Sequence, residues 1–313
     1  MQYRSLYNLA ELIRNNIHQI PHDIDLIVGV PRSGMIPALI IALYLNKRVT
    51  DLDAFVSGRV YEAGERSRYV LERDIKKVLV IDDSVRTGNA INKAKKKIND
   101  ANLSYQYTYL VPIVTSEKKD SVDIYFEIID DERIFEWNLF HHSMLESACL
   151  DIDGVLNVDP SFDTDDDGPA YINFLQHVEP LFIPTAPINT FISCRLEKYR
   201  AYTEEWLKKY NIQYKHLVML NLPSKVERLK WNKHGLYKAQ YYKEHGNLRL
   251  FIESSAKQAQ IIADYTLKPV ICIETNSLVQ PSAHMVSKKQ FRRSIRRRFP
   301  KIYTFMQNLF KRN

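Results

Sequence analysis

One stretch decides the fold of the N-terminal half: Val78-Leu-Val-Ile-Asp82-Asp83-Ser84-Val85-Arg86-Thr87-Gly88-Asn89. Its apolar start predicts a buried strand, which ends in two adjacent carboxylates and a small turn with hydroxyl groups that leads into a helix. The backbone N–H groups of such a turn, with the helix N-terminus, can bind a phosphate group. The two carboxylates can accept hydrogen bonds from two neighbouring hydroxyl groups. The stretch therefore predicts a site for a sugar phosphate.

The patterns on either side of this stretch alternate between strand and helix. In the first half we expect helices at residues 1–20, 36–45 and 90–99, and strands at 25–30, 77–82 and 105–114. A second series starts at Ala148, with strands expected at 189–193, 215–220, 248–252 and 270–273 and helices at 198–210 and 238–244. Such alternation is typical of parallel α/β architecture, whose ligands bind at the carboxyl ends of the strands.

The length of 313 residues exceeds what one hydrophobic core usually organises, so we expect two domains. We predict an α/β fold with two Rossmann-like parallel-sheet domains, at residues 1–142 and 146–284, and a basic amphipathic tail at 285–313. From Ser287 to Asn313 the chain has ten Lys or Arg residues and no acidic residue, whereas the whole chain has a net charge of +7. The part before the tail is therefore mildly acidic.

The stretch from Val78 to Asn89 resembles the 5-phosphoribosyl-diphosphate (PRPP) binding motif of type I phosphoribosyltransferases. This resemblance implies that Asp82 and Asp83 hold the ribose 2- and 3-hydroxyls. It implies that the 5-phosphate is held by Ser84, Arg86, Thr87 and Gly88. A bare pair of aspartates can also simply cap a helix, which is the alternative interpretation.

Two further segments resemble loops of the same family. Val30-Pro31-Arg32-Ser33-Gly34-Met35 resembles the pyrophosphate loop, in which Arg32, Ser33 and Gly34 would meet the diphosphate. The segment at 57–68 resembles the flexible loop that closes over PRPP, with candidate diphosphate contacts from Arg59, Arg66 and Arg68. Many purine-specific members carry an acidic residue where this chain has Arg86, so the sequence argues against a purine acceptor.

The second half carries two carboxylates two residues apart, in Leu150-Asp151-Ile152-Asp153-Gly154. This spacing suits a nucleophile and an acid/base in one pocket, with Mg²⁺ to neutralise a phosphoryl group. The segment resembles motif one of the haloacid dehalogenase (HAD) superfamily, which implies that Asp151 is the nucleophile and Asp153 the acid/base. The short connection between Leu156 and Phe191 predicts a minimal cap and an open pocket.

The later HAD motifs follow in the expected order. The resemblance implies that Ser193 donates to the phosphoryl group, that Lys238 neutralises charge, and that Glu253 holds the metal. Two serines follow Glu253 where a second acid often stands, so Mg²⁺ would depend on Asp151, the Asp153 carbonyl, Glu253 and water. Taken alone, Lys238 or Glu253 could be a solvated surface charge. We expect Mg²⁺ in both active sites.

Several other features are decoys or less specific. The segment Asp163–Gly168 starts like a calcium-binding EF-hand loop, but Phe174 stands where the bidentate Glu belongs, so we expect a solvated flap instead. We interpret His141 and His142 as linker surface or an interdomain contact rather than metal ligands, and the three cysteines as reduced thiols in a cytosolic protein. The tail combines basic and aromatic residues, which favours an anionic membrane surface over the alternatives of nucleic-acid binding or a solvated segment.

The two predicted sites share one chemical group, because the first leaves a 5-phosphate that the second could remove. The domain order resembles fused phosphoribosyltransferase–phosphatase proteins that install ribofuranose in bacterial surface polysaccharides such as O antigen or capsule. This implies transfer from PRPP to a lipid-linked or growing glycan acceptor, followed by removal of the 5-phosphate. We expect an enzyme at the inner face of the cytoplasmic membrane that binds no nucleic acid and is able to form a homo-oligomer. The alternatives are a salvage enzyme that joins PRPP to a nucleobase and trims the nucleotide, and a PRPP-sensing regulator that binds nucleic acid.

Overall fold

The structure is a computed structural model, and it describes residues 1–61, 74–165 and 167–283. The chain divides into two compact units between Trp137 and Asn138, and each unit is described here by itself. Among the described residues, no helix has the length and apolar character needed to cross a membrane. The predicted tail at 285–313 lies outside the described residues.

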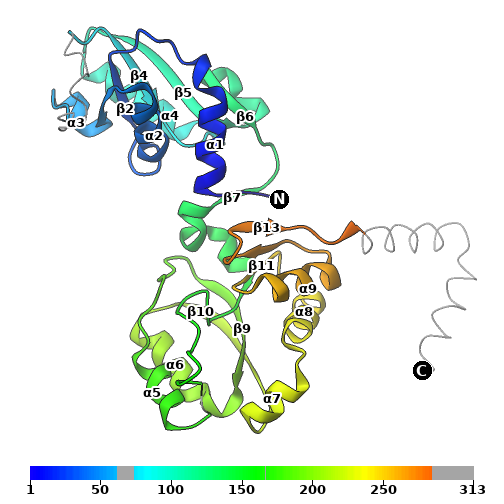
Figure 1. The fold of residues 1–313 in the computed structure, drawn as a ribbon. Helices are drawn as coiled ribbons and strands as arrows, with labels where there is room; N and C mark the ends of the chain where they lie inside the picture. The colour runs from blue at the N-terminus through cyan, green and yellow to red at the C-terminus, as the bar shows by residue number, and fades with distance from the viewer. Residues whose placement is uncertain (62–73, 166, 284–313) are drawn as a thin grey trace, which may run out of the picture. The chain divides into compact units, whose positions relative to one another are not determined.

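The first unit is built on a five-stranded parallel sheet (Figure 1). The strand order is β3 (Arg48–Asp51), β2 (Leu26–Gly29), β4 (Lys77–Ile81), β5 (Gln106–Val114) and β6 (Ile124–Ile128). All four neighbouring pairs run parallel. The chain goes from β2 to β3 on one side and then to β4 on the other side of β2. Because β2 and β4 run parallel, the loops that follow these two central strands lie at the same edge of the sheet.

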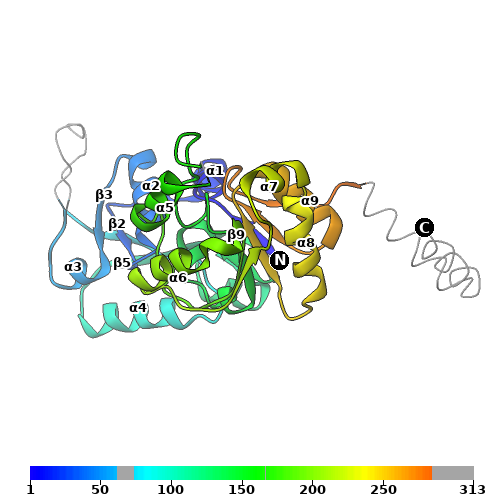
Figure 2. The ribbon, with the colours of Figure 1, turned by 90° about the horizontal axis from the view of Figure 1, so that it is seen from below.

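Helices cover both faces of this sheet. Alternate residues of β2 and β4 point to opposite faces, so that Ile27 and Leu79 pack with α1 (Leu6–Asn16) and α2 (Met35–Leu45). Leu26 and Val78 pack on the other face with α3 (Leu52–Val56) and α4 (Asn89–Asp100). Figure 2 shows β3, β2 and β5 between α2 and α4. The continuous apolar runs in these strands follow from burial on both faces.

The expected helix over residues 1–20 is wrong at both ends. Residues Gln2–Arg4 form strand β1, which pairs in parallel with β7 (Arg133–Phe135). The helix begins only after Ser5, whose side-chain oxygen accepts the N–H of Asn8 while the Asn8 side chain accepts the N–H of Ser5. A short 3₁₀ turn, Ile17–Gln19, follows the helix. The pairing of β1 with β7 depends on residues about 130 positions apart, which a local pattern does not show.

The second unit has a six-stranded sheet. Its order is β10 (Tyr214–Leu220), β9 (Ile188–Leu196), β8 (Ala148–Leu150), β11 (Leu250–Glu253), β12 (Val270–Cys272) and β13 (Ser277–Val279). The first five strands run parallel and β13 is antiparallel to β12. The α/β prediction with parallel sheets is confirmed for both units.

Among the described residues of this unit, five helices accompany the sheet, and Figure 1 shows α8 and α9 side by side. Helices α8 (His234–Glu244) and α9 (Ala256–Thr266) pack with Cys149 and Phe251. The other helices are α5 (Pro169–His177), α6 (Arg200–Lys209) and α7 (Lys225–Trp231). In the described part of the connection from β8 to β9, α5 is the one helix. Further 3₁₀ turns are Ser116–Ser121, Glu136–His141, Ser143–Ser147 and Glu197–Tyr199.

Candidate active sites

The pyrophosphate loop and the PRPP motif, predicted from separate segments, meet at the carboxyl ends of β2 and β4. Gly29 and Ile81 pair in register at the ends of the two strands, and the Val30 N–H donates to the Ile81 carbonyl at 2.8 Å. A Cβ atom at Gly34 would lie 2.6 Å from the Val30 carbonyl oxygen and 2.9 Å from the Asp82 Cα. The absence of a side chain at Gly34 therefore lets the two loops touch through their backbones.

The structure places the other pyrophosphate-loop residues at the surface of this edge. Arg32 is exposed and Ser33 is half-buried, and the peptide bond between Pro31 and Arg32 is cis. A diphosphate could reach both side chains. The main chain of Arg59 bonds with Ala54 and with the Thr50 hydroxyl near the carboxyl end of β3, the strand next to β2. Arg66 and Arg68 lie outside the described residues.

Asp82 and Asp83 are both almost buried, with 5% and 6% of their surfaces exposed. Burial, together with the neighbouring charge of Asp83, raises the pKa of Asp82 to about 7. The Asp83 N–H donates to Asp82 Oδ1 at 2.9 Å, and the indole N–H of Trp137 donates to Asp83 Oδ2 at 2.8 Å. The pair is thus a preformed acceptor site for hydroxyl groups.

The turn after the two aspartates leads into helix α4. Ser84 and Val85 are tied to β5, where the Val85 N–H donates to the Ile113 carbonyl at 2.9 Å. Gly88 has a φ of +85° and is the N-cap of α4, where it has no side chain to cap the helix, and the Asn89 N–H donates to Thr87 Oγ1 at 3.4 Å. Arg86 and Thr87 are exposed beside it. This combination of a helix N-terminus, a hydroxyl and a cation fits a phosphate group.

Two residues of this site were missed by the sequence analysis. Arg133 is 6% exposed, and its guanidinium donates to the Ile129 carbonyl at 3.2 Å. Burial and the charge of Arg86 lower its pKa, whereas Asp83 and Asp130 oppose that effect, so Arg133 lies within electrostatic range of both predicted site residues. Trp137 is the second. Arg133 begins the short strand β7 and Trp137 follows it, and no local pattern indicated that strand.

In the second unit, three adjacent strands bring the predicted HAD residues together. Asp151 follows β8, Ser193 lies in β9, and Glu253 ends β11, and these three strands are neighbours at the centre of the sheet. Lys238 reaches them from α8. Its Nζ lies 2.5 Å from Asp151 Oδ2 and 2.8 Å from Glu253 Oε2. The side chains of this cluster are buried, with 1% of Lys238 and none of Glu253 exposed.

The charged side chains of this buried cluster shift one another's pKa values. Burial opposes the charge of Lys238, but Asp151 and Glu253 outweigh that effect and raise its pKa. Burial also raises the pKa of Asp151, an effect that Lys238 opposes. Lys238 is therefore a fixed cation between two carboxylates, a geometry that suits a nucleophilic carboxylate and a charge-neutralising lysine.

Asp153 is held by a bidentate ion pair that the sequence analysis did not predict. Arg195 Nε lies 3.0 Å from Asp153 Oδ2, and a terminal Arg195 nitrogen lies 2.6 Å from Oδ1. Although burial acts to raise the pKa of Asp153, Arg195 and Asn157 together lower it. Ser193 is 1% exposed, and its hydroxyl accepts the Arg195 N–H at 3.1 Å. Asp153 is thus ionised in this state, ready to accept a proton before it can donate one.

The donor set of this cluster includes oxygen ligands of the kind that a hard cation such as Mg²⁺ takes. Asp151 and Glu253 offer carboxylate oxygens, which such cations prefer, whereas the carboxylate of Asp153 is engaged by Arg195. Among the residues that the structure describes, no three acidic, His or Cys side chains converge closely enough to hold a metal. Binding of Mg²⁺ through Asp151, Glu253, the Asp153 carbonyl and water therefore stays a prediction. Asp159 lies close to this cluster, since a Cβ atom at Gly154 would be 2.9 Å from its Oδ2, and burial and the charges of Asp153 and Glu253 raise its pKa.

The expectation of a solvated flap at Asp163–Gly168 is wrong. Asp165 pairs with Arg228 at 3.1 Å and with Lys225 at 3.2 Å. Asp167 pairs with Lys198 at 2.8 Å. These described acids therefore fasten the loop to neighbouring segments.

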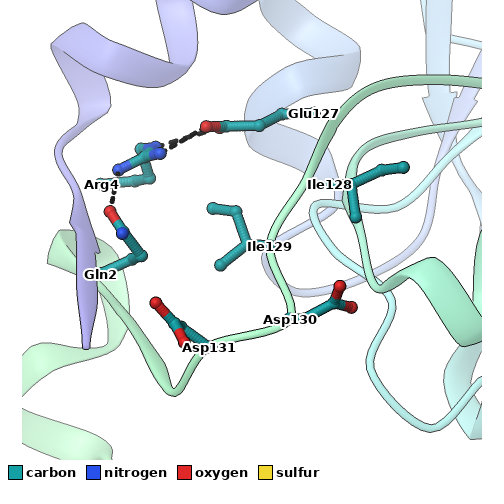
Figure 3. Close-up of a pocket in the computed structure, with 7 residues that line it drawn as sticks. All are labelled: Gln2, Arg4, Glu127, Ile128, Ile129, Asp130 and Asp131. Carbon is teal, nitrogen blue, oxygen red and sulfur yellow. Dashed lines mark hydrogen bonds and ion pairs between the residues drawn. The ribbon is translucent and has the colours of Figure 1, made fainter.

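A separate cavity of about 340 Å³ lies in the first unit (Figure 3). Figure 3 shows Arg4 bonded to Glu127 at one side of the cavity. Asp131 lies at the other side and is not bonded to Arg4 in this view. The cavity contains none of the predicted site residues. Its lining comprises Gln2, Arg4, Glu127, Ile128, Ile129, Asp130 and Asp131.

Comparison with known proteins identifies the first unit. Residues 2–144 match the family model described as the phosphoribosyl transferase domain. The N-terminal unit is a phosphoribosyl transferase domain. A domain of this kind implies transfer of a phosphoribosyl group from PRPP. The matched segment ends before Asp151, and no curated protein matches the chain.

Solved structures similar to the chain include several phosphoribosyltransferases. The purine phosphoribosyltransferase from Pyrococcus horikoshii is 19% identical with a TM-score of 0.32, and the match covers 44% of this chain and 92% of that one. For the Helicobacter pylori xanthine-guanine-hypoxanthine enzyme the values are 18%, 0.34, 44% and 92%. For the orotate phosphoribosyltransferase from Aeropyrum pernix they are 20%, 0.29, 38% and 68%. At such identities and TM-scores these similarities do not bear on the acceptor.

Proposed function

We propose that the chain is a bifunctional enzyme that transfers 5-phosphoribosyl from PRPP to a glycan hydroxyl and then removes the 5-phosphate. The phosphoribosyl transferase domain supports the first step. The second step rests on one observation above all, the buried contact of Lys238 with both Asp151 and Glu253. A buried lysine between a strand-end aspartate and a second acid suits phosphoryl transfer through a carboxylate nucleophile.

In the first step, Asp82 and Asp83 accept the two ribose hydroxyls, and the turn at 84–88 binds the 5-phosphate. Diphosphate leaves C1 toward Arg32 and Ser33, with Gly34 at the base of the loop. The acceptor hydroxyl attacks C1 from the opposite face, so the α-configured donor gives a β-ribofuranosyl 5-phosphate. Mg²⁺, when bound, would neutralise part of the charge on the diphosphate.

In the second step, Asp151 attacks the phosphorus while Ser193 and Lys238 bind the phosphoryl oxygens. Asp153 first takes a proton from solvent. The bond to the ribose 5-oxygen then breaks, and Asp153 donates this proton to the leaving oxygen, which restores the hydroxyl. Asp153 then takes a proton from water as the water hydrolyses the aspartyl phosphate. Arg195 holds Asp153 in place for both transfers. Mg²⁺ would be held by Asp151, the Asp153 carbonyl and Glu253, and it would neutralise the phosphoryl charge.

A glycan acceptor is supported by two features. Arg86 is a cation where a purine-binding member would carry an acid, and the described connection between β8 and β9 adds only α5 near the second site. We further propose that the tail at 285–313 lies on the inner face of the cytoplasmic membrane, where a lipid-linked acceptor would be available. A nucleobase acceptor is the rival, because a phosphoribosyl transferase domain is equally compatible with it.

Diphosphate release tests the acceptor class. The purified chain, supplied with Mg²⁺ and PRPP, should release diphosphate with lipid-linked or synthetic glycans and not with free nucleobases. Release with nucleobases alone would replace the glycan proposal by nucleotide salvage. Salt-sensitive binding of RNA or DNA without turnover would favour a regulator instead.

A further inference from the structure

The indole of Trp137 makes a direct polar contact with the PRPP-motif pair. Its N–H donates to Asp83 Oδ2 at 2.8 Å. An indole is a donor only, so this contact requires an oxygen that accepts. It fixes which oxygen of Asp83 is engaged and therefore how the carboxylate is turned.

The indole is itself held rigidly. Its ring stacks on Phe135, with 4.7 Å between ring centroids and an interplanar angle of 1°. Phe135 is 7% exposed and ends β7, where it pairs in register with Arg4 of β1. Trp137 also packs against the core residues Ile113 and Ile129. The position of the donor is thus set by the small sheet of β1 and β7.

The orientation of the Asp83 carboxylate depends on Trp137, because neither Asp82 nor Arg133 fixes it. Asp82 Oδ1 is engaged by the Asp83 N–H, and Arg133 nearby is held by the Ile129 carbonyl. Two adjacent carboxylates that must accept two adjacent ribose hydroxyls need fixed directions, since a hydrogen bond weakens steeply when its angle falls below about 120°. Trp137 supplies that direction from outside the motif.

We propose that Trp137 is a positioning residue that orients Asp83 for the ribose of PRPP. The proposal rests on the proposed use of PRPP and goes beyond it, because it assigns a role to a residue outside the PRPP motif and the pyrophosphate loop. It also gives the small sheet of β1 and β7 a function in the site.

Trp137→Phe tests this, because phenylalanine keeps an aromatic ring on Phe135 and loses the N–H. Calorimetry should show PRPP binding weakened about tenfold, the typical effect of one hydrogen bond to a charged group. Binding of inorganic diphosphate, which has no ribose, should be unchanged. In an Asp83→Asn background the same substitution should add little. Trp231→Phe, in the other unit, is the matched control and should alter neither ligand.

Each other outcome has a defined meaning. Equal weakening of PRPP and diphosphate, or no change in either, would overturn the positioning role. If the wild-type chain bound neither ligand, the proposed function would fail and this inference with it. Should Trp137→Phe not fold, Phe135→Leu carries the test, since it loosens the indole and keeps the N–H. It should weaken PRPP binding and spare diphosphate, and the inference fails if it does not.

Discussion

Asp82 and Lys238 show how single buried charges depend on their immediate neighbours. Asp82 is buried beside another carboxylate, so its protonated form is favoured. Lys238 is buried between two carboxylates, so its charged form is favoured. Burial disfavours the charged form of both side chains, so the neighbouring charges decide which form is favoured, and each case can be tested through stability.

Titration of Asp82 should make the first unit less stable as pH rises. Its folded pKa of about 7 lies above the ordinary value of 3.8, so the folded state keeps a proton that the unfolded state releases. Stability should fall by about 2–4 kcal/mol between about pH 4 and pH 7 and then level off. Asp82→Asn should remove that part of the fall. The measurement is the unfolding free energy of both proteins across this range, followed by Trp137 emission in chains carrying Trp206→Phe and Trp231→Phe.

Lys238→Met should destabilise the second unit by about 3–5 kcal/mol, because it leaves two buried carboxylates without their cation. The loss should shrink at acid pH, where the carboxylates protonate. Lys257→Met, at an exposed position of α9, is the control and should change stability little. Thermal and denaturant unfolding of the three proteins would check this. Equal effects of the two substitutions would contradict the buried cluster.

At the scale of elements, the loops after β2 and β4 depend on one close backbone approach. Gly34→Ala would place a Cβ within 2.9 Å of backbone atoms of Val30, Ile81 and Asp82, none of which can rotate away. We expect a loss of about 1–3 kcal/mol in stability and weaker PRPP binding, because the two loops must move apart. Gly246→Ala is the matched control, since its Cβ would meet no atom within 4 Å. Unchanged PRPP affinity in Gly34→Ala would show that the loops do not act together.

The central strands could be predicted from the sequence, because an apolar run buried on both faces is a local signal. Strands β2 and β4 and helix α2 lie within a residue or two of their expected bounds. Strands β1 and β7 could not be predicted, because each exists only through its pairing with the other. Their recognition needs contacts between the two ends of the unit.

The same distinction applies to the site residues. Asp82, Asp83 and Asp151 follow strands, so their place at a sheet edge comes from the local pattern. The partners that orient them do not: Trp137 reaches Asp83, and Arg195 reaches Asp153, across 54 and 42 positions. Motifs therefore indicated the groups that are proposed to touch substrate, whereas the residues that hold them emerged only from the packing.

At the scale of the whole molecule, two α/β units, each with a sheet of mainly parallel strands, carry two sets of buried charges suited to the same sugar phosphate. The first unit is a phosphoribosyl transferase domain, and the proposed phosphatase chemistry belongs to the second. Removal of the 5-phosphate would prevent reversal of the ribosyl transfer, since the first site needs that group to hold the ribose. Because the two sites belong to separate units, each activity should survive loss of the other.

Product mass tests this division of labour most directly. The wild-type chain and Asp151→Asn would each be incubated with PRPP, Mg²⁺ and a glycan acceptor, and the products would be weighed by mass spectrometry. We predict ribosylated glycan from the wild type and, from Asp151→Asn, the same glycan still carrying one phosphate, with equal diphosphate release. Identical products from the two proteins, or no ribose transfer by the wild type, would contradict the account.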